Sequence, residues 1–159
     1  GLIAGLAEHP GIGFILVKSD ELGGLVIGGG GIHYLSDDRV EGVDPLIGFG
    51  PNASHHLRRT HSFNNAPDIL VNSFYDPHAE EGAAFEELIG FHGGMGGNQT
   101  HPFLLFPAGF ELPEQPIVGA ATVHHLFKGW MAAINDGTAP APWSVPERPS
   151  NAPVPARRA

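Results

Sequence analysis

The sequence predicts an α/β fold in which helices flank a partial mixed sheet that includes a small antiparallel meander. Three observations indicate this class. Short apolar runs rich in β-branched and aromatic residues occur at 12–17 and 68–75, as in buried strands. Glycines separate two further short runs within residues 25–35. At 117–134, apolar residues recur with the 3.6-residue spacing of one helix face.

The N-terminal part is expected to contain a helix end followed by the meander. Residues 2–8 end a helix, because His9-Pro10-Gly11 follows them as a stop signal. The run 12–17 then starts the meander, which continues through 25–27 and 32–35. The four glycines between the last two runs are interpreted as a turn, because the Lys and Ser/Thr of a phosphate-binding loop are missing and no helix follows.

The middle of the chain predicts a helix, a strand and a second helix. Residues 52–54 can cap a short helix that extends to about Thr60 and turns Leu57 inward. The strand at 68–75 follows, and an acidic helix is expected at 80–88.

The clearest predicted helix spans 117–134, with Pro116 in its first turn and Asp136-Gly137 as its stop signal. Proline and alanine dominate the remaining residues, so we expect 138–159 to be a disordered tail and 1–137 to be the folded portion. The stripe expected to face a core consists of Ile117, Ala120, Ala121, Val123, Leu126, Phe127, Trp130, Met131 and Ile134.

Composition limits the partners of the chain. The formal net charge is −9 with only 8 Lys and Arg residues, so binding to a nucleic-acid backbone is not expected. A large anionic substrate would need a metal ion to offset this acidity. Cysteine is absent, which excludes disulfides and thiolate metal sites, and no apolar run approaches the roughly 20 residues that span a bilayer.

The beginning of the chain favours a processed or excised piece of a longer protein. Gly1 stands in place of an initiator Met, and the sequence starts within a helical pattern. Residues 2–7 are too short for a signal peptide and lack its basic flank. Taken alone, the chain is expected to be soluble, and its compartment is left open.

Ten histidines in an acidic chain favour a search for a metal site, because imidazole and carboxylate together bind zinc or iron. His55-His56 and His124-His125 are interpreted as surface or packed residues, because neighbours on a helix point about 100° apart. His92 differs, since glycines at 90, 93, 94, 96 and 97 let its loop approach an ion closely. A flexible glycine loop with an incidental histidine is the alternative.

Other catalytic motifs are missing from the sequence. It has neither the HExxH helix signature nor a Gly-x-Ser-x-Gly elbow, so an esterase triad has no nucleophile here. Asp76 follows a strand where open α/β sheets carry their sites, but Asp76-Pro77 is favoured as a plain turn. Asp37-Asp38 and Glu80-Glu81 are interpreted as solvated surface charges.

Several segments taken together are similar to one family. They are PDILVNSFYD at 67–76, AFEEL at 84–88, HGG at 92–94, QT at 99–100 and PFLLFP at 102–107. They resemble the C-terminal part of bacterial, mainly actinobacterial, proteins of the type I phosphodiesterase/nucleotide pyrophosphatase group in the alkaline phosphatase superfamily. The resemblance covers residues 1 to about 135 and implies that 1–137 is the C-terminal portion of an alkaline-phosphatase-like α/β domain.

The resemblance also implies a chemistry. In that superfamily two metal ions, usually zinc, activate a Ser or Thr that attacks a phosphate or sulfate ester. His92 matches a late metal ligand in a His-Gly context. The nucleophile, an early Asp and a paired Asp-His lie upstream in the family, and no Asp-His dipeptide occurs here. The predicted function is therefore the C-terminal segment of a metal-dependent phosphodiester or phosphomonoester hydrolase that is inactive by itself.

Two other functions stay open. The apolar helix could dock on another copy of the chain or on another subunit, which would make the chain a non-catalytic self-associating or partner-binding module. Several of the ten histidines could instead form a small metal-binding protein. The expected partners are accordingly the remainder of the parent polypeptide or another copy of the chain, with a phosphate-ester substrate for the parent.

Overall fold

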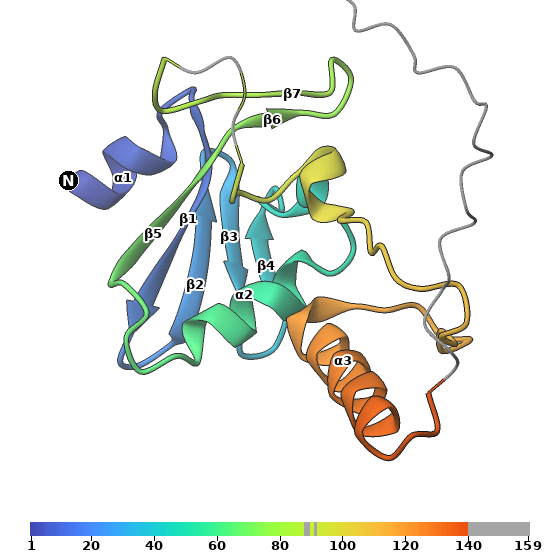
Figure 1. Cartoon of the computed structure of the whole chain (residues 1–159). Coiled ribbons are helices and arrows are strands. Elements are labelled where there is room, and N and C mark those ends of the chain that lie inside the picture. Colours follow the sequence, from blue (N-terminus) through green and yellow to red (C-terminus); the bar gives the residue numbers. More distant parts are fainter. Residues whose placement is uncertain (88–89, 91, 140–159) are drawn as a thin grey trace, which may run out of the picture. The chain divides into compact units, whose positions relative to one another are not determined.

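A five-stranded sheet organises the first of the two units into which the chain divides, Gly1–Phe103 and Leu104–Ala159. The computed structural model describes residues 1–87, 90 and 92–139. The strand order is β4-β3-β2-β1-β5 (Figure 1). The strands are β1 (Ile12–Ser19), β2 (Gly23–Gly28), β3 (Gly31–Tyr34), β4 (Val40–Gly42) and β5 (Ile69–Ser73).

The predicted α/β class and the antiparallel meander are confirmed. β1, β2 and β3 follow one another in the sequence and pair as neighbours. The strand expected at 68–75 joins them as β5, on the other side of β1. Within the described residues, every strand pairing of this sheet is antiparallel, whereas the sequence predicts a mixed sheet. The folded portion predicted at 1–137 spans both units.

β1 is a central strand and is buried on both faces. Its neighbours are β2 and β5, and its side chains alternate, so that Phe14 and Leu16 belong to one core and Ile15 and Val17 to the other. All four side chains are buried. A strand that is covered on both sides needs apolar residues at successive positions, which explains the uninterrupted apolar run in the sequence.

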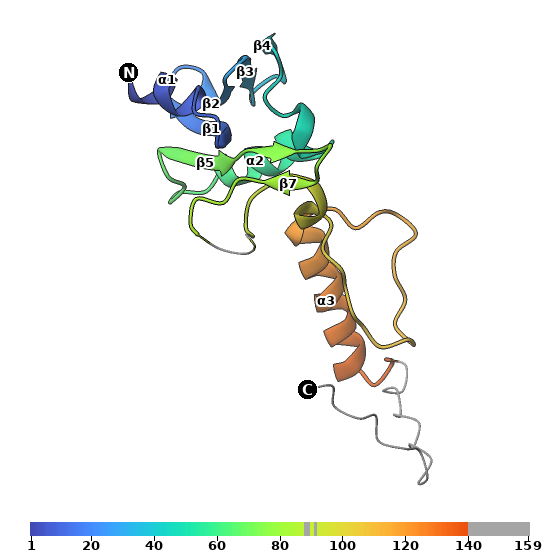
Figure 2. The same cartoon turned by 90° about the horizontal axis from the view of Figure 1, so that it is seen from above.

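Helices cover the two faces of the sheet (Figure 2). α1 (Leu2–Ala7) packs on the face that carries Ile15 and Val17. α2 (Ala53–His61) and the 3-10 helix η1 (Ile47–Phe49) cover the opposite face. The buried residues of that second core are Phe14, Leu16, Val26, Leu35, Leu46, Phe49, Ala53 and Leu57, the last of which has the inward position that the sequence predicts.

The acidic helix predicted at 80–88 is wrong for the residues of that segment that the structure describes. Glu81–Gly82 form β7, which pairs with β6 (Tyr75–Asp76) in a separate two-stranded sheet. Glu80 has a left-handed backbone angle, φ 54°, which a helix does not accommodate. The hairpin pairing therefore overrides a weak helical pattern. Leu88, at the end of the predicted helix, lies outside the described residues.

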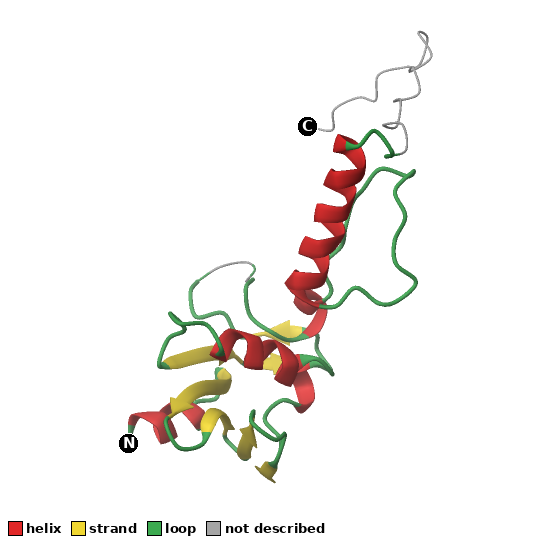
Figure 3. Ribbon diagram, turned by 90° about the horizontal axis from the view of Figure 1, so that it is seen from below, coloured by secondary structure: helices red, strands yellow, loops and turns green. Residues whose placement is uncertain are grey.

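The second unit contains the long helix α3 (Gly119–Asn135), which confirms the helix predicted at 117–134. A loop precedes α3 (Figure 3), and the Phe106 and Phe110 rings of this loop lie 5.3 and 5.2 Å from the Trp130 ring. Although these aromatic contacts cover part of the apolar stripe, no residue of the described helix is buried. The stripe therefore does not form the core that the sequence predicts.

The C-terminal tail predicted at 138–159 lies outside the described residues from 140 onwards. Thr138 still contacts the end of α3, where its hydroxyl donates to the Ala133 carbonyl at 3.3 Å. Within the part of the chain that the structure describes, no helix has both the length and the apolar composition to cross a membrane.

A first prediction concerns Gly13, which lies at a shift of register between β1 and β5. A methyl group at this position would lie 2.5 Å from the Phe49 ring and 2.8 Å from the Ser73 carbonyl oxygen. We expect Gly13→Ala to lower the free energy of unfolding by about 1–3 kcal/mol, because a packed core must shift. Gly5→Ala is the control, since Gly5 is helical and has open space around it. Equal effects of the two substitutions in chemical denaturation would contradict this account.

Candidate functional site: the glycine-rich loop and its pocket

The candidate site is the glycine-rich loop that follows His92, whose side chain is exposed. Gly93, Gly96 and Gly97 have φ angles of 88°, 115° and 56°. Residues with a side chain rarely adopt such angles, so these glycines set the path of the loop. The loop therefore takes a path that depends on glycine at these three positions.

Asn72 of β5 holds the loop to the sheet through its side chain. The Met95 amide donates to Asn72 Oδ1 at 2.8 Å, and the Asn72 side-chain amide donates to the Met95 carbonyl at 3.3 Å. One side chain thus pairs with both backbone groups of one loop residue, as a neighbouring strand would. Asn72 is only 4% exposed, so water cannot easily replace these partners. Gln99 adds a third bond, from its Nε2 to the Met95 carbonyl at 3.2 Å.

Tyr75 supports the far end of the loop. A Cβ added at Gly96 or Gly97 would come within 2.8 or 2.5 Å of the Tyr75 side chain, so only glycine allows this close approach. The Thr100 hydroxyl donates to the Gly97 carbonyl at 2.7 Å. The backbone that follows His92 is therefore fixed at several points within a few residues.

His92 lines a pocket of about 420 Å³ beside β5. This volume falls in the range of small-ligand sites. Apolar and small residues form most of its lining, and the polar side chains of the lining are Asn72, Ser73, Glu86 and His92. Asn72 therefore contributes both to the lining of the pocket and to the position of the loop.

An exposed imidazole beside such a pocket can serve as one zinc ligand. In the part of the chain that the structure describes, however, no group of three or more His, Asp or Glu side chains could hold a metal ion. His55 and His56 lie together on α2 with ring centroids 5.5 Å apart, and His124 and His125 lie on α3 with centroids 5.8 Å apart. The described residues thus do not complete a metal site around His92.

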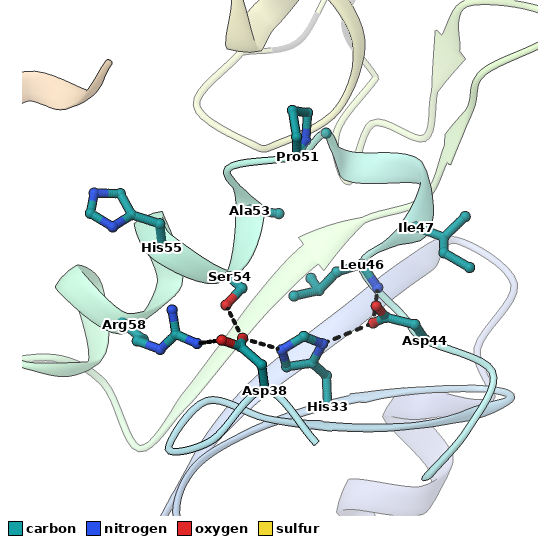
Figure 4. A pocket seen from close by; sticks show the side chains of 11 residues that line it. His33, Asp38, Asp44, Leu46, Ile47, Pro51, Ala53, Ser54, His55 and Arg58 are labelled. Atoms are coloured by element: carbon teal, nitrogen blue, oxygen red, sulfur yellow. Dashed lines mark hydrogen bonds and ion pairs between the residues drawn. The ribbon is translucent and has the colours of Figure 1, made fainter. Parts of the chain in front are cut away.

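A second group of polar side chains surrounds the buried His33 of β3 (Figure 4). His33 Nδ1 lies 3.1 Å from Asp44 Oδ1, and its Nε2 lies 2.9 Å from Asp38 Oδ1. Asp38 also accepts a hydrogen bond from the Ser54 hydroxyl at 2.6 Å and forms an ion pair with Arg58. The network therefore joins β3 and its following turn to α2 and to the segment before η1.

The polar groups of this network largely satisfy one another. An ionised carboxylate only accepts hydrogen bonds, so both His33 contacts are hydrogen bonds only when both ring nitrogens carry a proton. The Leu46 amide donates to Asp44 at 3.0 Å, and Arg58 Nε donates to the Leu35 carbonyl at 2.6 Å. A pocket of about 680 Å³ borders the network, but these polar side chains already bond to protein. We therefore interpret the network as a structural connection.

Sequence reasoning missed this network. The interpretation of Asp38 as a solvated surface charge is incomplete, because its half-exposed carboxylate has three side-chain partners. Asp38 has a φ of 57°, a left-handed conformation that Asp tolerates better than most residues. The available signal was His33 itself, a histidine inside an otherwise apolar strand. Its partners come from distant segments, which no local pattern identifies.

The plain turn that the sequence favours at Asp76-Pro77 is confirmed. Asp76 Oδ1 accepts hydrogen bonds from the backbone amides of His78 at 2.8 Å and Ala79 at 3.3 Å. These bonds lower the pKa of Asp76 below its ordinary value, with the amide of His78 as the larger cause. The carboxylate therefore stabilises the turn between β6 and β7.

Comparisons of the chain with models of protein families, with curated proteins and with solved structures find no match in any of the three. The resemblance to the phosphodiesterase group therefore stays a hypothesis.

The polar network predicts a pH dependence of stability. Hydrogen bonds from Ser54, then Arg58 and His33, hold the pKa of Asp38 well below its ordinary value of 3.8. A carboxylate with a lower pKa in the folded chain stabilises the fold above pH 3.8, and this contribution is lost as the pH falls towards the folded pKa. We expect Ser54→Ala to raise the midpoint of acid unfolding, followed by circular dichroism. The exposed Ser36 gives the control Ser36→Ala, which should leave the midpoint unchanged. Identical midpoints for Ser54→Ala and the unmodified chain would refute the role of Asp38.

Proposed function

We propose that the chain supplies one wall and one metal ligand of the active site of a metal-dependent phosphodiester or phosphomonoester hydrolase. The ligand is His92. The observation that carries the proposal is that this exposed histidine lines a pocket next to a loop anchored by the buried Asn72.

The anchoring supports the proposal on physical grounds. A metal ligand has to be held in position, and the groups behind it affect metal affinity nearly as much as the ligand itself. The bonds at Met95 and Gly97 restrict the loop close to His92 while leaving the imidazole exposed. An exposed imidazole on a restrained loop can complete a site whose other ligands come from outside these residues.

The resemblance of the sequence supports the same role, since a late histidine in a His-Gly step binds metal in the phosphodiesterase group. When bound, the metal pair would neutralise charge on the transferring phosphoryl group. Asn72 and Tyr75 would keep the His92 loop in place, and the pocket would contact the ester. The nucleophile and the remaining ligands would lie outside the 159 residues, so the isolated chain would not hydrolyse the ester.

The test is His92→Ala in the complete protein that contains this sequence. Zinc content should fall, and hydrolysis of bis(4-nitrophenyl) phosphate should decrease by at least about a hundredfold, because loss of a direct ligand exceeds the loss from its supporting groups. His101→Ala is the matched control, because His101 is also exposed in the same unit. Unchanged zinc content and unchanged hydrolysis in His92→Ala would end the proposal.

A second candidate function, self-association without catalysis, is favoured by α3. Phe127, Met131 and Ile134 share one face of this helix and are 40%, 55% and 56% exposed. Apolar surface of this kind gains free energy when a second copy covers it.

If α3 mediates self-association, sedimentation equilibrium of the chain should give a mass above 16.8 kDa. Met131→Lys should restore the monomer, because it places a charge in the apolar face. His125→Lys, a substitution at an exposed position on the same helix, should leave the mass unchanged. A strictly monomeric unmodified chain would count against this second function.

A further inference from the structure

The pocket beside His92 has an apolar wall that the metal-binding role does not use. Phe85 lines it, beside residues of β5. Phe85 is 63% exposed, so a large aromatic side chain faces solvent here instead of packing in the core. A ligand group that covers such surface gains free energy in proportion to the apolar area removed from water.

The charges of the pocket restrict what that ligand group can be. Among the described residues of its lining, the titratable side chains are Glu86 and His92, and neither Lys nor Arg contributes. Sites for phosphate groups normally supply cationic side chains that form charge-assisted hydrogen bonds. A substrate with additional phosphates would bring them towards Glu86 without a cation from this wall, and the chain as a whole carries a net charge of −9. An uncharged group meets no such repulsion.

The two halves of the pocket suggest how one substrate would be divided between them. His92 and Phe85 line the same space of about 420 Å³, which is large enough for a small ligand. A phosphodiester has one reacting phosphorus and two substituents, one of which leaves. Because His92 and Phe85 line one pocket, a substituent on a phosphorus held near His92 would share that pocket with the Phe85 ring.

We propose that this pocket binds the uncharged apolar or aromatic substituent of a phosphodiester, with Phe85 as a specificity-determining residue. The inference rests on the proposed function, because it needs the reacting phosphorus to lie near His92. Phe85 contacts the substituent through its ring and takes no part in bond breaking. Substrates with an apolar substituent are therefore preferred to polyphosphates.

The experiment compares two esters with the same leaving group in the complete protein. Bis(4-nitrophenyl) phosphate offers the pocket an aromatic substituent, and methyl 4-nitrophenyl phosphate offers only a methyl group. Phe85→Ala should lower kcat/KM for the first ester about tenfold and for the second less than about twofold, because only the aromatic group loses its contact. Phe103→Ala is the matched control, since Phe103 is 93% exposed and does not line the pocket. It should leave both values unchanged.

A charge substitution tests the exclusion of polyphosphates. Glu86→Lys should raise kcat/KM for ATP relative to bis(4-nitrophenyl) phosphate, because it places a cation in the pocket. Two results would overturn this inference: equal losses of kcat/KM for both diesters in Phe85→Ala, or a preference of the unmodified protein for ATP. If hydrolysis still depended on His92 in either case, the proposed function would stand. The absence of hydrolysis that depends on His92, for all three substrates, would overturn both.

Discussion

The pairing of the buried Asn72 side chain with the backbone of Met95 links the fold to the candidate site. Asn72 comes from β5, which is held in the sheet by the central strand β1. Its amide group satisfies the N–H and the C=O of one loop residue and is itself shielded from water. Removing a partner from such a buried group costs on the order of 1–3 kcal/mol, so the loop is strongly restrained at this point. His92 lies three residues before this anchored residue.

The chemistry of the first unit is divided between two regions of different character. Around His33, each charged group bonds to another part of the protein, and the network joins the turn after β3 to α2. Near His92, the loop is anchored at Met95, while the imidazole and the Phe85 ring stay exposed. A satisfied network stabilises the fold, whereas restrained but exposed groups are available to a ligand. This contrast, rather than the number of histidines, identifies the candidate site.

Much of the fold could be predicted from local patterns. The apolar run of β1 and the helical spacing of α3 are strong signals over several residues. The pattern at 80–88 was too weak to compete with the hairpin between β6 and β7, in which Glu80 takes a left-handed angle. Glycines around His92 indicated the loop. The hydrogen bonds between Asn72 and this loop could not be predicted, because a buried asparagine in a strand does not specify a partner 23 residues away.

The most direct test of this account is hydrogen exchange at the Met95 amide. In Asn72→Ala, exchange at Met95 should accelerate at least about tenfold more than exchange at Leu16 of β1, because a local restraint is lost. Asn98→Ala, at an exposed position in the 3-10 helix η2 (Gly97–Thr100), should leave the rate at Met95 unchanged. Acceleration by the same factor at Met95 and Leu16, or none at Met95, would contradict the claim that Asn72 holds the loop of His92 in place.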